Sequence, residues 1–205
     1  MTARFVTLEG GEGVGKSTQL KALADGLRDR GLDVLETREP GGSAGAEAIR
    51  ALLLHDQDWT AQAEALLFAA ARADHVAKTI RPALEEGKWV VCDRFLDSSI
   101  AYQGGAGGLG FEAIRQLHAF GSHGFLPDRT LLLKLDDAEA KRRASKRDIE
   151  GADLIGGRGS DYHAAVAAAF DRVAAEEPDR YRVIEASGSA SEVTARLLAA
   201  VEDLI

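Results

Sequence analysis

Short apolar runs rich in β-branched residues alternate with longer amphipathic stretches along the chain. This alternation is typical of an α/β protein in which helices connect the strands of a parallel sheet. Strands are predicted at residues 4–8, 34–37, 89–92, 130–135 and 182–185. Helices are predicted at residues 16–30, 44–54, 60–86, 111–120, 137–147, 161–177 and 191–203.

Two glycine-rich segments, residues 104–110 and 151–159, interrupt this pattern. Each is either a flexible connection or a mobile part of an active site, because loops on a rigid scaffold often carry function. Composition alone leaves both interpretations open.

The 205 residues are 45% hydrophobic, which is enough apolar side chain for one full-sized core. We therefore expect a single domain over residues 1–205. The formal net charge of -8 counts against DNA or RNA as the main partner, but not against a small anionic ligand. No stretch has the length and apolar character of a membrane span or a signal peptide, so we expect no membrane partner and a cytoplasmic protein.

The single cysteine, Cys92, ends the apolar run Trp89-Val90-Val91-Cys92. One cysteine cannot form an internal disulfide or a cysteine-rich metal site. A buried thiol and a nucleophile are the two interpretations, and the apolar surroundings favour the buried thiol.

The segment Gly10-Gly11-Glu12-Gly13-Val14-Gly15-Lys16-Ser17 matches the phosphate-binding pattern G-x-x-x-x-G-K-S, between a predicted strand and a predicted helix. Glycines allow successive backbone N–H groups to point at phosphate oxygens, beside the positive end of the helix dipole. We expect ATP to bind to this segment and to Thr18, the next residue. Lys16 would act in catalysis on the β- and γ-phosphates, and Ser17 would bind Mg²⁺. The alternative is a glycine-rich turn with an exposed lysine.

Asp93 follows the apolar strand 89–92, at the edge of the sheet where ligands bind in open α/β folds. A carboxylate in this position can hold Mg²⁺ directly or through water. The alternative is a strand-end aspartate that caps the next helix. The phosphate-binding segment favours the metal role for Asp93.

Beyond the phosphate loop, four stretches resemble the thymidylate kinase family. They are Thr37-Arg38-Glu39-Pro40-Gly41-Gly42, Leu67-Phe68-Ala69-Ala70-Ala71-Arg72, Asp93-Arg94-Phe95-Leu96-Asp97-Ser98-Ser99 and Ala101-Tyr102-Gln103-Gly104. The resemblance implies a P-loop NTPase fold, a five-stranded parallel sheet flanked by helices with a lid segment, and a homodimer. It also implies transfer of the γ-phosphate of ATP to dTMP with Mg²⁺, which gives ADP and dTDP for dTTP synthesis.

The resemblance implies that Arg38 and Arg94 hold the monophosphate of dTMP, and that Arg94 also serves catalysis. Planar guanidinium groups suit phosphate oxygens, although any arginine taken alone could instead form a surface salt bridge. Arg50, on the helix after the Arg-Glu-Pro-Gly-Gly turn, either contributes to the same phosphate contact or is an exposed helix arginine, and the second interpretation is favoured. Glu12 would repel a triphosphate unless it has another task. The resemblance implies such a task, a contact with a metal-bound water or with the 3′-hydroxyl of dTMP; the alternative is a solvent-facing carboxylate.

For the nucleoside, the resemblance implies that Phe68 and Arg72 contact the thymine ring. Ser99 and Gln103 would lie near its polar edge, and Tyr102 would pack beneath the sugar, where it would disfavour a 2′-hydroxyl. The alternative for Phe68 is a core residue, since a phenylalanine on an apolar helix face is usually buried.

Phosphoryl transfer requires positive charge on the moving group. The phosphate loop holds no arginine, and this resembles the bacterial members that carry a catalytic arginine on the lid, here at about residues 143–160. Arg147 and Arg143 are the candidates, with Arg158 third; the alternative is a solvated basic helix end. The arginine and glutamate that many relatives carry are missing from segment 153–158, where the sequence departs from the family pattern.

Two other classes of function remain as alternatives. One is another small P-loop kinase acting on a different nucleoside monophosphate, such as dUMP or dCMP. The other is a nucleotide-dependent switch of the GTPase type, but the Asn-Lys-x-Asp segment that recognises guanine does not occur. A degenerate P-loop protein is disfavoured because Lys16, Ser17 and Asp93 are all present.

Overall fold

The structure is a computed structural model that describes residues 2–54, 58–136, 139–140, 142 and 159–205. Its sheet has five parallel strands in the order β2-β3-β1-β4-β5. The strands are β1 (Phe5–Glu9), β2 (Val34–Arg38), β3 (Trp89–Asp93), β4 (Arg129–Lys134) and β5 (Tyr181–Glu185). All strand predictions and the predicted fold class are therefore confirmed, with strand end points that differ by at most one residue.

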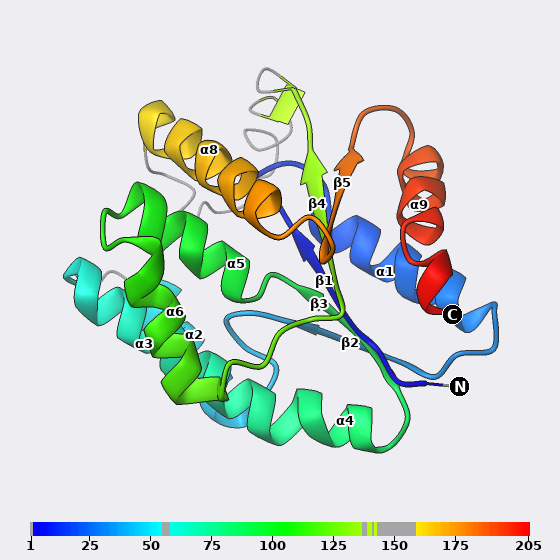
Figure 1. The fold of residues 1–205 in the computed structure, drawn as a ribbon, viewed down its shortest axis with the longest axis horizontal. Coiled ribbons are helices and arrows are strands. Elements are labelled where there is room, and N and C mark those ends of the chain that lie inside the picture. Colours follow the sequence, from blue (N-terminus) through cyan, green and yellow to red (C-terminus); the bar gives the residue numbers. More distant parts are fainter. Residues whose placement is uncertain (1, 55–57, 137–138, 141, 143–158) are drawn as a thin grey trace.

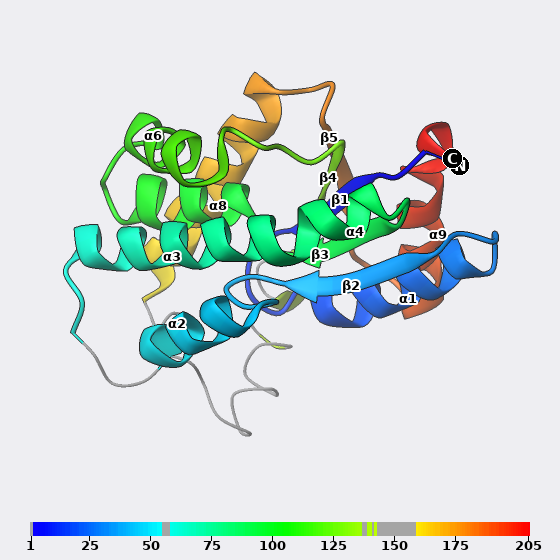
Figure 2. The ribbon, with the colours of Figure 1, turned by 90° about the horizontal axis from the view of Figure 1, so that it is seen from below.

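Helices lie on both sides of this sheet (Figure 1). On one side are α1 (Lys16–Arg28) and α9 (Ala190–Ala199), followed by a short 3₁₀ helix at Glu202–Leu204. On the other side are α3 (Ala61–His75), α4 (Arg81–Glu85), α5 (Leu96–Ser99), α6 (Phe111–Ser122) and α8 (Ser160–Glu176). Figure 2 shows α2 (Ala44–Leu54) beside α3 and close to the end of β2.

The two sides of the sheet hold separate apolar cores, because successive side chains of a strand point to opposite faces. Val6 and Leu131 pack with helices α1 and α9, whereas Phe5 and Leu132 pack with the helices of the other side. Strands covered on both faces read as continuous apolar runs, which is why β1, β3 and β4 were recognisable. Cys92 is buried in the core that contains Phe5 and Leu132, as its apolar run predicted.

The segment after β3 was not predicted to be helical. It forms α5 and then a π-helical turn at Ile100–Ala106. Gly104 and Gly105, at the start of the first glycine-rich segment, therefore belong to a helix and not to a loop. The predicted helix 60–86 is interrupted by a second π-helical turn at Val76–Ile80, between α3 and α4.

The predicted helix 137–147 and the predicted lid 143–160 fall almost wholly outside the described residues. The same holds for most of the second glycine-rich segment. Within the part of the chain that the structure describes, no helix has both the length and the apolar character needed to cross a membrane.

Candidate active site

The carboxyl ends of β1, β2 and β3 meet at one edge of the sheet. Leu8 of β1 and Arg38 of β2 both pair in register with Asp93 of β3. The loop after β1, the end of β2 and the start of α5 therefore come together, although they are far apart in sequence. They line a cavity of about 730 Å³ that also reaches α3 and the start of α9.

The predicted phosphate loop, residues 10–17, curves around the amino end of α1. Gly15 has a φ of 91°, and Gly10 has a φ of 139° with its α-carbon so close to β4 that a Cβ would lie 2.5 Å from the carbonyl oxygen of Leu133. Only glycine adopts both positions without strain. The loop can therefore bring its backbone N–H groups toward an anion at the helix amino end.

Lys16 folds back across this loop. Its Nζ donates hydrogen bonds to the carbonyl oxygens of Gly11 at 2.6 Å and Gly10 at 3.2 Å. Burial, together with the charge of Arg94, lowers the pKa of Lys16 to about 8, although Glu12, Asp93 and Glu9 act in the opposite direction. A desolvated ammonium group at this point provides a concentrated positive charge for phosphate oxygens.

Ser17 and Asp93 both line the cavity and form a direct contact. The Oγ of Ser17 donates a hydrogen bond to Oδ2 of Asp93 at 2.8 Å. The other carboxylate oxygen, Oδ1, is buried and has no hydrogen-bond partner among the described residues. A hydroxyl beside a buried, unpartnered carboxylate oxygen fits the oxygen-ligand preference of Mg²⁺.

Arg94 lies across the centre of the cavity. Its backbone has a φ of 68°, which is unusual for a residue other than glycine, and this conformation turns the chain sharply after β3. Its guanidinium donates to the carbonyl oxygen of Gly10 at 3.2 Å and to Ser98 Oγ at 3.1 Å, and it lies over the ring of Tyr102. These contacts hold one rigid cation between the phosphate loop and α5.

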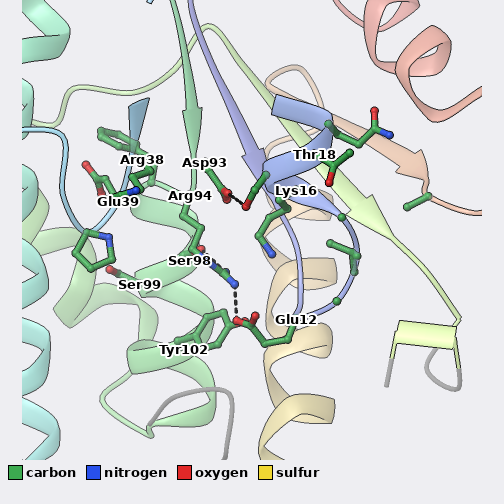
Figure 3. Close-up of a pocket in the computed structure, with 18 of the residues that line it drawn as sticks. Glu12, Lys16, Thr18, Arg38, Glu39, Asp93, Arg94, Ser98, Ser99 and Tyr102 are labelled. Carbon is green, nitrogen blue, oxygen red and sulfur yellow. Dashed lines mark hydrogen bonds and ion pairs between the residues drawn. The ribbon is translucent and has the colours of Figure 1, made fainter. Parts of the chain in front are cut away.

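Glu12 extends from the phosphate loop toward this arginine (Figure 3). Its Oε1 accepts hydrogen bonds from Arg94 Nη2 at 2.5 Å and from the hydroxyl of Tyr102 at 3.3 Å. Burial raises the pKa of Tyr102 to about 12, so its hydroxyl remains a donor at neutral pH. The negative charge that looked unfavourable in the sequence is therefore balanced by Arg94 across the cavity.

Glu9 and Ser98 form a hydrogen-bond network that holds Arg94 in place. Neither residue was predicted from the sequence to belong to the site. Glu9 accepts hydrogen bonds from the N–H groups of Phe95 and Ser98 and from the hydroxyl of Ser98. The same hydroxyl oxygen accepts the bond from Arg94. A glutamate at the end of an otherwise apolar strand was the available sequence signal, since a fully buried carboxyl requires partners.

Arg72 of α3 is only 2% exposed, although it lines the cavity. It donates from Nε to Glu39 at 2.8 Å and from Nη2 to Ser99 Oγ at 2.7 Å. These contacts exclude a surface salt bridge for this arginine. Glu39, the residue after β2, belongs to the site and was also missed.

Four further predicted or discussed residues lie along the same cavity. Phe68 is half-buried on its wall, and Gln103 is buried with its amide donating to Glu64 at 2.8 Å. Arg38 is exposed and contacts Glu47 at 3.3 Å. Arg50 is not the exposed helix arginine that was expected, because its Nη1 donates to the carbonyl oxygen of Pro40 at 2.7 Å and it lines the cavity.

The end of the cavity near α9 contains residues for which the sequence analysis had no role. They are Gln19, Ala186, Gly188, Ala190 and Val193. Gln19 is anchored there by a hydrogen bond to the carbonyl oxygen of Ala190 and by one from the hydroxyl of Thr194. Small and apolar side chains rarely signal a site in a sequence, because the same residues are common in helix starts and cores.

The predicted catalytic arginines Arg143 and Arg147, and the third candidate Arg158, lie outside the described residues. Among the residues that are described, no group of three or more histidine, cysteine, aspartate or glutamate side chains gathers as a metal site. Any Mg²⁺ at Ser17 and Asp93 would therefore need phosphate oxygens and water as its remaining ligands.

A glycine-rich phosphate loop at the amino end of a helix, a buried lysine, a strand-end aspartate and a cavity lined by four arginines define a P-loop nucleotide kinase. The comparisons with known proteins identify the family. The family model for thymidylate kinase matches residues 8–197. The chain belongs to the thymidylate kinase family, and its reaction is the ATP-dependent phosphorylation of dTMP to dTDP.

The relatives match along their full length. A thymidylate kinase from Rhizorhabdus wittichii is 66% identical over 207 residues, and one from Bifidobacterium longum strain DJO10A is 47% identical over 209 residues; each alignment covers 100% of both chains. The crystal structure of thymidylate kinase from Ehrlichia chaffeensis aligns with a TM-score of 0.80 and 31% identity, covering 98% of this chain and 99% of that one. The family and the activity inferred from the sequence are thereby confirmed.

Proposed function

We propose that this chain carries out its reaction in the cavity at the edge of the sheet, with ATP on the phosphate loop and dTMP against α3 and α5. The observation that carries the proposal is that one continuous cavity is lined by Lys16 and Ser17 at one side and by Arg72 and Tyr102 at the other. Both substrates can therefore meet around Arg94. The two cores share one sheet, which supports a single domain over residues 1–205.

On the ATP side, the N–H groups of the loop from Gly10 to Gly15, with Ser17 and Thr18 at the start of α1, bind the phosphates. Lys16 exchanges its bonds to Gly10 and Gly11 for bonds to phosphate oxygens. Adenine occupies the end of the cavity near Ala186, Gly188 and Val193, where small and apolar side chains leave room for a flat ring.

Ser17 and Asp93 hold Mg²⁺ in this proposal. The support is the short contact between them and the buried, unpartnered Oδ1 of Asp93. A bound Mg²⁺ would neutralise charge on the transferring phosphates. The chain itself contributes the orientation of the two oxygen ligands, because Ser17 is fixed in the first turn of α1 and Asp93 in β3.

On the dTMP side, Arg94 and Arg38 bind the monophosphate, and Arg50 adds a third guanidinium from α2. Arg94 also stabilises the transferring group, because it is held between Glu12 and the face of Tyr102. Glu12 contacts the sugar or a metal-bound water. Tyr102 packs beneath the sugar, where its ring leaves no space for a 2′-hydroxyl.

The base lies against Phe68 and Arg72, with Ser99 and Gln103 at its polar edge. A guanidinium can only donate hydrogen bonds, so Arg72 favours a base that presents a carbonyl oxygen. Thymine and uracil carry a carbonyl where cytosine carries an amino group. The proposal therefore predicts that dCMP is a poorer substrate than dUMP.

The further positive charge that stabilises the transferring phosphoryl group is assigned to Arg147 or Arg143 on the lid segment 143–160. The support is the absence of arginine from the phosphate loop sequence. Comparing the kcat of Arg147→Ala, Arg143→Ala and Arg158→Ala at saturating substrates decides between them. Equal activity of all three variants with the unmodified enzyme would contradict the lid assignment.

The enzyme is proposed to act as a homodimer in the cytoplasm, the compartment that holds its co-substrate ATP. Helices α3 and α6 pack together and expose Leu66, which is 55% exposed, and Phe120, which is 90% exposed. Large apolar side chains of this kind mark protein contacts when they gather on one surface. Light scattering of Phe120→Asp and Leu66→Asp should give monomers; dimers in both variants would exclude this surface.

A coupled assay that follows ADP formation tests the substrate proposal. It is run with dTMP, dUMP, dCMP and TMP carrying a ribose at equal concentrations. We expect the highest kcat/KM for dTMP, a decrease for the ribose form and the lowest value for dCMP. Equal values for all four monophosphates would contradict the proposed base and sugar contacts.

A further inference from the structure

A buried histidine outside the cavity connects the end of β2 to Arg72. His75 is 0% exposed, and it lies one helical turn after Arg72 on α3. Its Nδ1 is 3.1 Å from Glu39 Oε1, and its Nε2 is 2.7 Å from the hydroxyl oxygen of Thr37. Glu39 in turn accepts the bond from Arg72 through its other oxygen. The four side chains form one continuous hydrogen-bonded chain.

The donors and acceptors of this chain follow from the chemistry of its members. The carboxylate of Glu39 can only accept, so Nδ1 of His75 carries the hydrogen toward it. In the neutral imidazole, Nε2 then accepts from the hydroxyl of Thr37. Both nitrogens are satisfied, as a fully buried ring requires.

The turn after Glu39 packs closely against the ring of His75. A Cβ added to Gly42 would lie 2.3 Å from Nε2 of His75, so the backbone of the turn after Glu39 packs directly on the imidazole. Thr79, one turn further along, donates to the carbonyl oxygen of Gly42 at 2.7 Å. The turn and the helix are therefore joined at His75.

This arrangement fixes Arg72 from one side. Its Nε and Nη2 are occupied by Glu39, Ser99 and the carbonyl oxygen of Phe95. Its Nη1 donates no hydrogen bond to any described residue, and the side chain lines the cavity. The free edge of the guanidinium is therefore the one available to a ligand, and Glu39 determines which edge that is.

The same arrangement orients Arg38. Side chains alternate along a strand, so Thr37 and Glu39 point to His75 while Arg38, between them, points away from it. Arg38 lines the cavity, although it is exposed. His75 therefore contacts both Thr37, next to Arg38 at the end of β2, and Glu39, whose carboxylate orients Arg72.

We propose that His75 and Glu39 are positioning residues for nucleotide recognition, and that His75 acts on the base through Glu39 and Arg72. This inference rests on the proposed contact between Arg72 and the base. Loss of His75 should free Glu39 to rotate, and Arg72 would follow it. Binding of a base with a carbonyl should weaken, while the phosphate loop and the ATP site remain unchanged.

The test compares His75→Leu with His118→Leu, which removes another buried histidine that lines no part of the cavity. His118 lies on α6 and is 4% exposed, and its Nε2 is hydrogen-bonded to the carbonyl oxygen of Phe125, which follows that helix. We expect the KM for dTMP to rise about tenfold in His75→Leu, as for the loss of one buried hydrogen bond. The kcat at saturating dTMP and the KM for ATP should stay within about twofold, and the preference for dTMP over dCMP should decrease.

A conservative variant separates positioning from general damage to the fold. Asparagine places an amide N–H near the position of Nδ1, so His75→Asn should keep the bond to Glu39 and restore most of the affinity for dTMP. His118→Leu should lower thermal stability without changing either KM. If His75→Leu lowers stability as much as His118→Leu does but leaves the KM for dTMP and the dCMP discrimination unchanged, the inference is wrong.

Arg72→Ala distinguishes this inference from the function on which it rests. If Arg72→Ala itself leaves dTMP binding and dCMP discrimination unchanged, the proposed base contact fails. If Arg72→Ala weakens dTMP binding and His75→Leu does not, only the role of His75 fails. In the double variant, His75→Leu should add less than about twofold to the effect of Arg72→Ala on base discrimination, because residues that act through one contact are not additive.

Discussion

The hydroxyl of Ser17 donates to the carboxylate of Asp93 across 2.8 Å, although 76 positions separate the two residues. The contact joins the first turn of α1 to the last residue of β3. It arises because β1 and β3 are adjacent parallel strands whose carboxyl ends lie together. The strand-end aspartate is therefore engaged with the phosphate loop and does not cap the next helix.

We expect Asp93→Asn to lower kcat by about 100-fold, the range observed when a preorganised charge is removed from an active site. The amide can still accept from Ser17, but it no longer provides a negative charge for Mg²⁺. The measurement is kcat as a function of Mg²⁺ concentration, and the half-saturating concentration should rise. An unchanged Mg²⁺ titration would exclude Asp93 as a metal-side residue.

Lys16→Ala should lower kcat by about two to three orders of magnitude while dTMP affinity stays nearly the same. The reason is that the Nζ of Lys16 is hydrogen-bonded to Gly10 and Gly11 of the phosphate loop, where the phosphates of ATP are proposed to bind. Calorimetric titration of dTMP and steady-state turnover measure the two effects separately. A large loss of dTMP affinity would mean that the lysine orders the acceptor site as well.

Arg94→Ala should instead weaken dTMP binding by about 10- to 100-fold, as expected for a charge-assisted hydrogen bond. Arg94 is held between Glu12 and Tyr102, on the side of the cavity where the monophosphate is proposed to lie. Arg38→Ala is the matched comparison, because Arg38 is exposed and should have a smaller effect. If calorimetry finds unchanged dTMP affinity in Arg94→Ala, the phosphate role of this arginine is wrong.

The secondary structure was predictable where an element is buried on one face only, or where a strand is buried on both faces. Runs such as Leu131-Leu132-Leu133 identify a strand covered on both faces. The helix after β3 was missed because it is buried all around, so its sequence has no amphipathic period. From Leu96 to Gly104 every residue is buried, and Ser, Asp and Gly in this stretch resemble a loop.

The site was predictable where a residue type and its spacing carry the chemistry, as in the phosphate loop. It was not predictable where chemistry depends on convergence of distant segments. Glu39 reads as an ordinary polar residue of a turn until Arg72 and His75 of α3 are seen beside it. Arg50 likewise looked like a solvent-exposed residue because the turn it contacts through Pro40 lies beside its helix only in the folded chain.

The buried carboxyl of Glu9 predicts a pH dependence of folding. Burial raises its pKa from 4.5 to about 8, and the charge of Asp97 adds to this shift. Between these two pH values the folded protein keeps a proton on Glu9 that the unfolded chain has lost. The stability from this proton is complete below pH 4.5 and is lost as the pH rises through about 8.

His118 changes the free energy of unfolding in the opposite direction, and it does so at lower pH. This determines the pH range in which the effect of Glu9 can be measured. Burial lowers its pKa from 6.5 to about 4, so stability gained through His118 increases as the pH rises from about 4 to 6.5. Lys16, whose pKa is lowered to about 8, begins to contribute only above that value. The range between pH 6.5 and 8 therefore isolates Glu9 from both of these groups.

In that range, urea denaturation of the unmodified protein should show a decrease in the free energy of unfolding on the order of 1–2 kcal/mol. Glu9→Gln cannot lose a proton, so its free energy of unfolding should stay nearly constant from pH 6.5 to 8, whatever its absolute value. Only the difference in slope is used, because the amide also changes the hydrogen bond with Ser98. Parallel slopes for the two proteins would show that Glu9 is already ionised in the folded state, and that Arg94 and the hydrogen bonds from α5 outweigh the cost of burial.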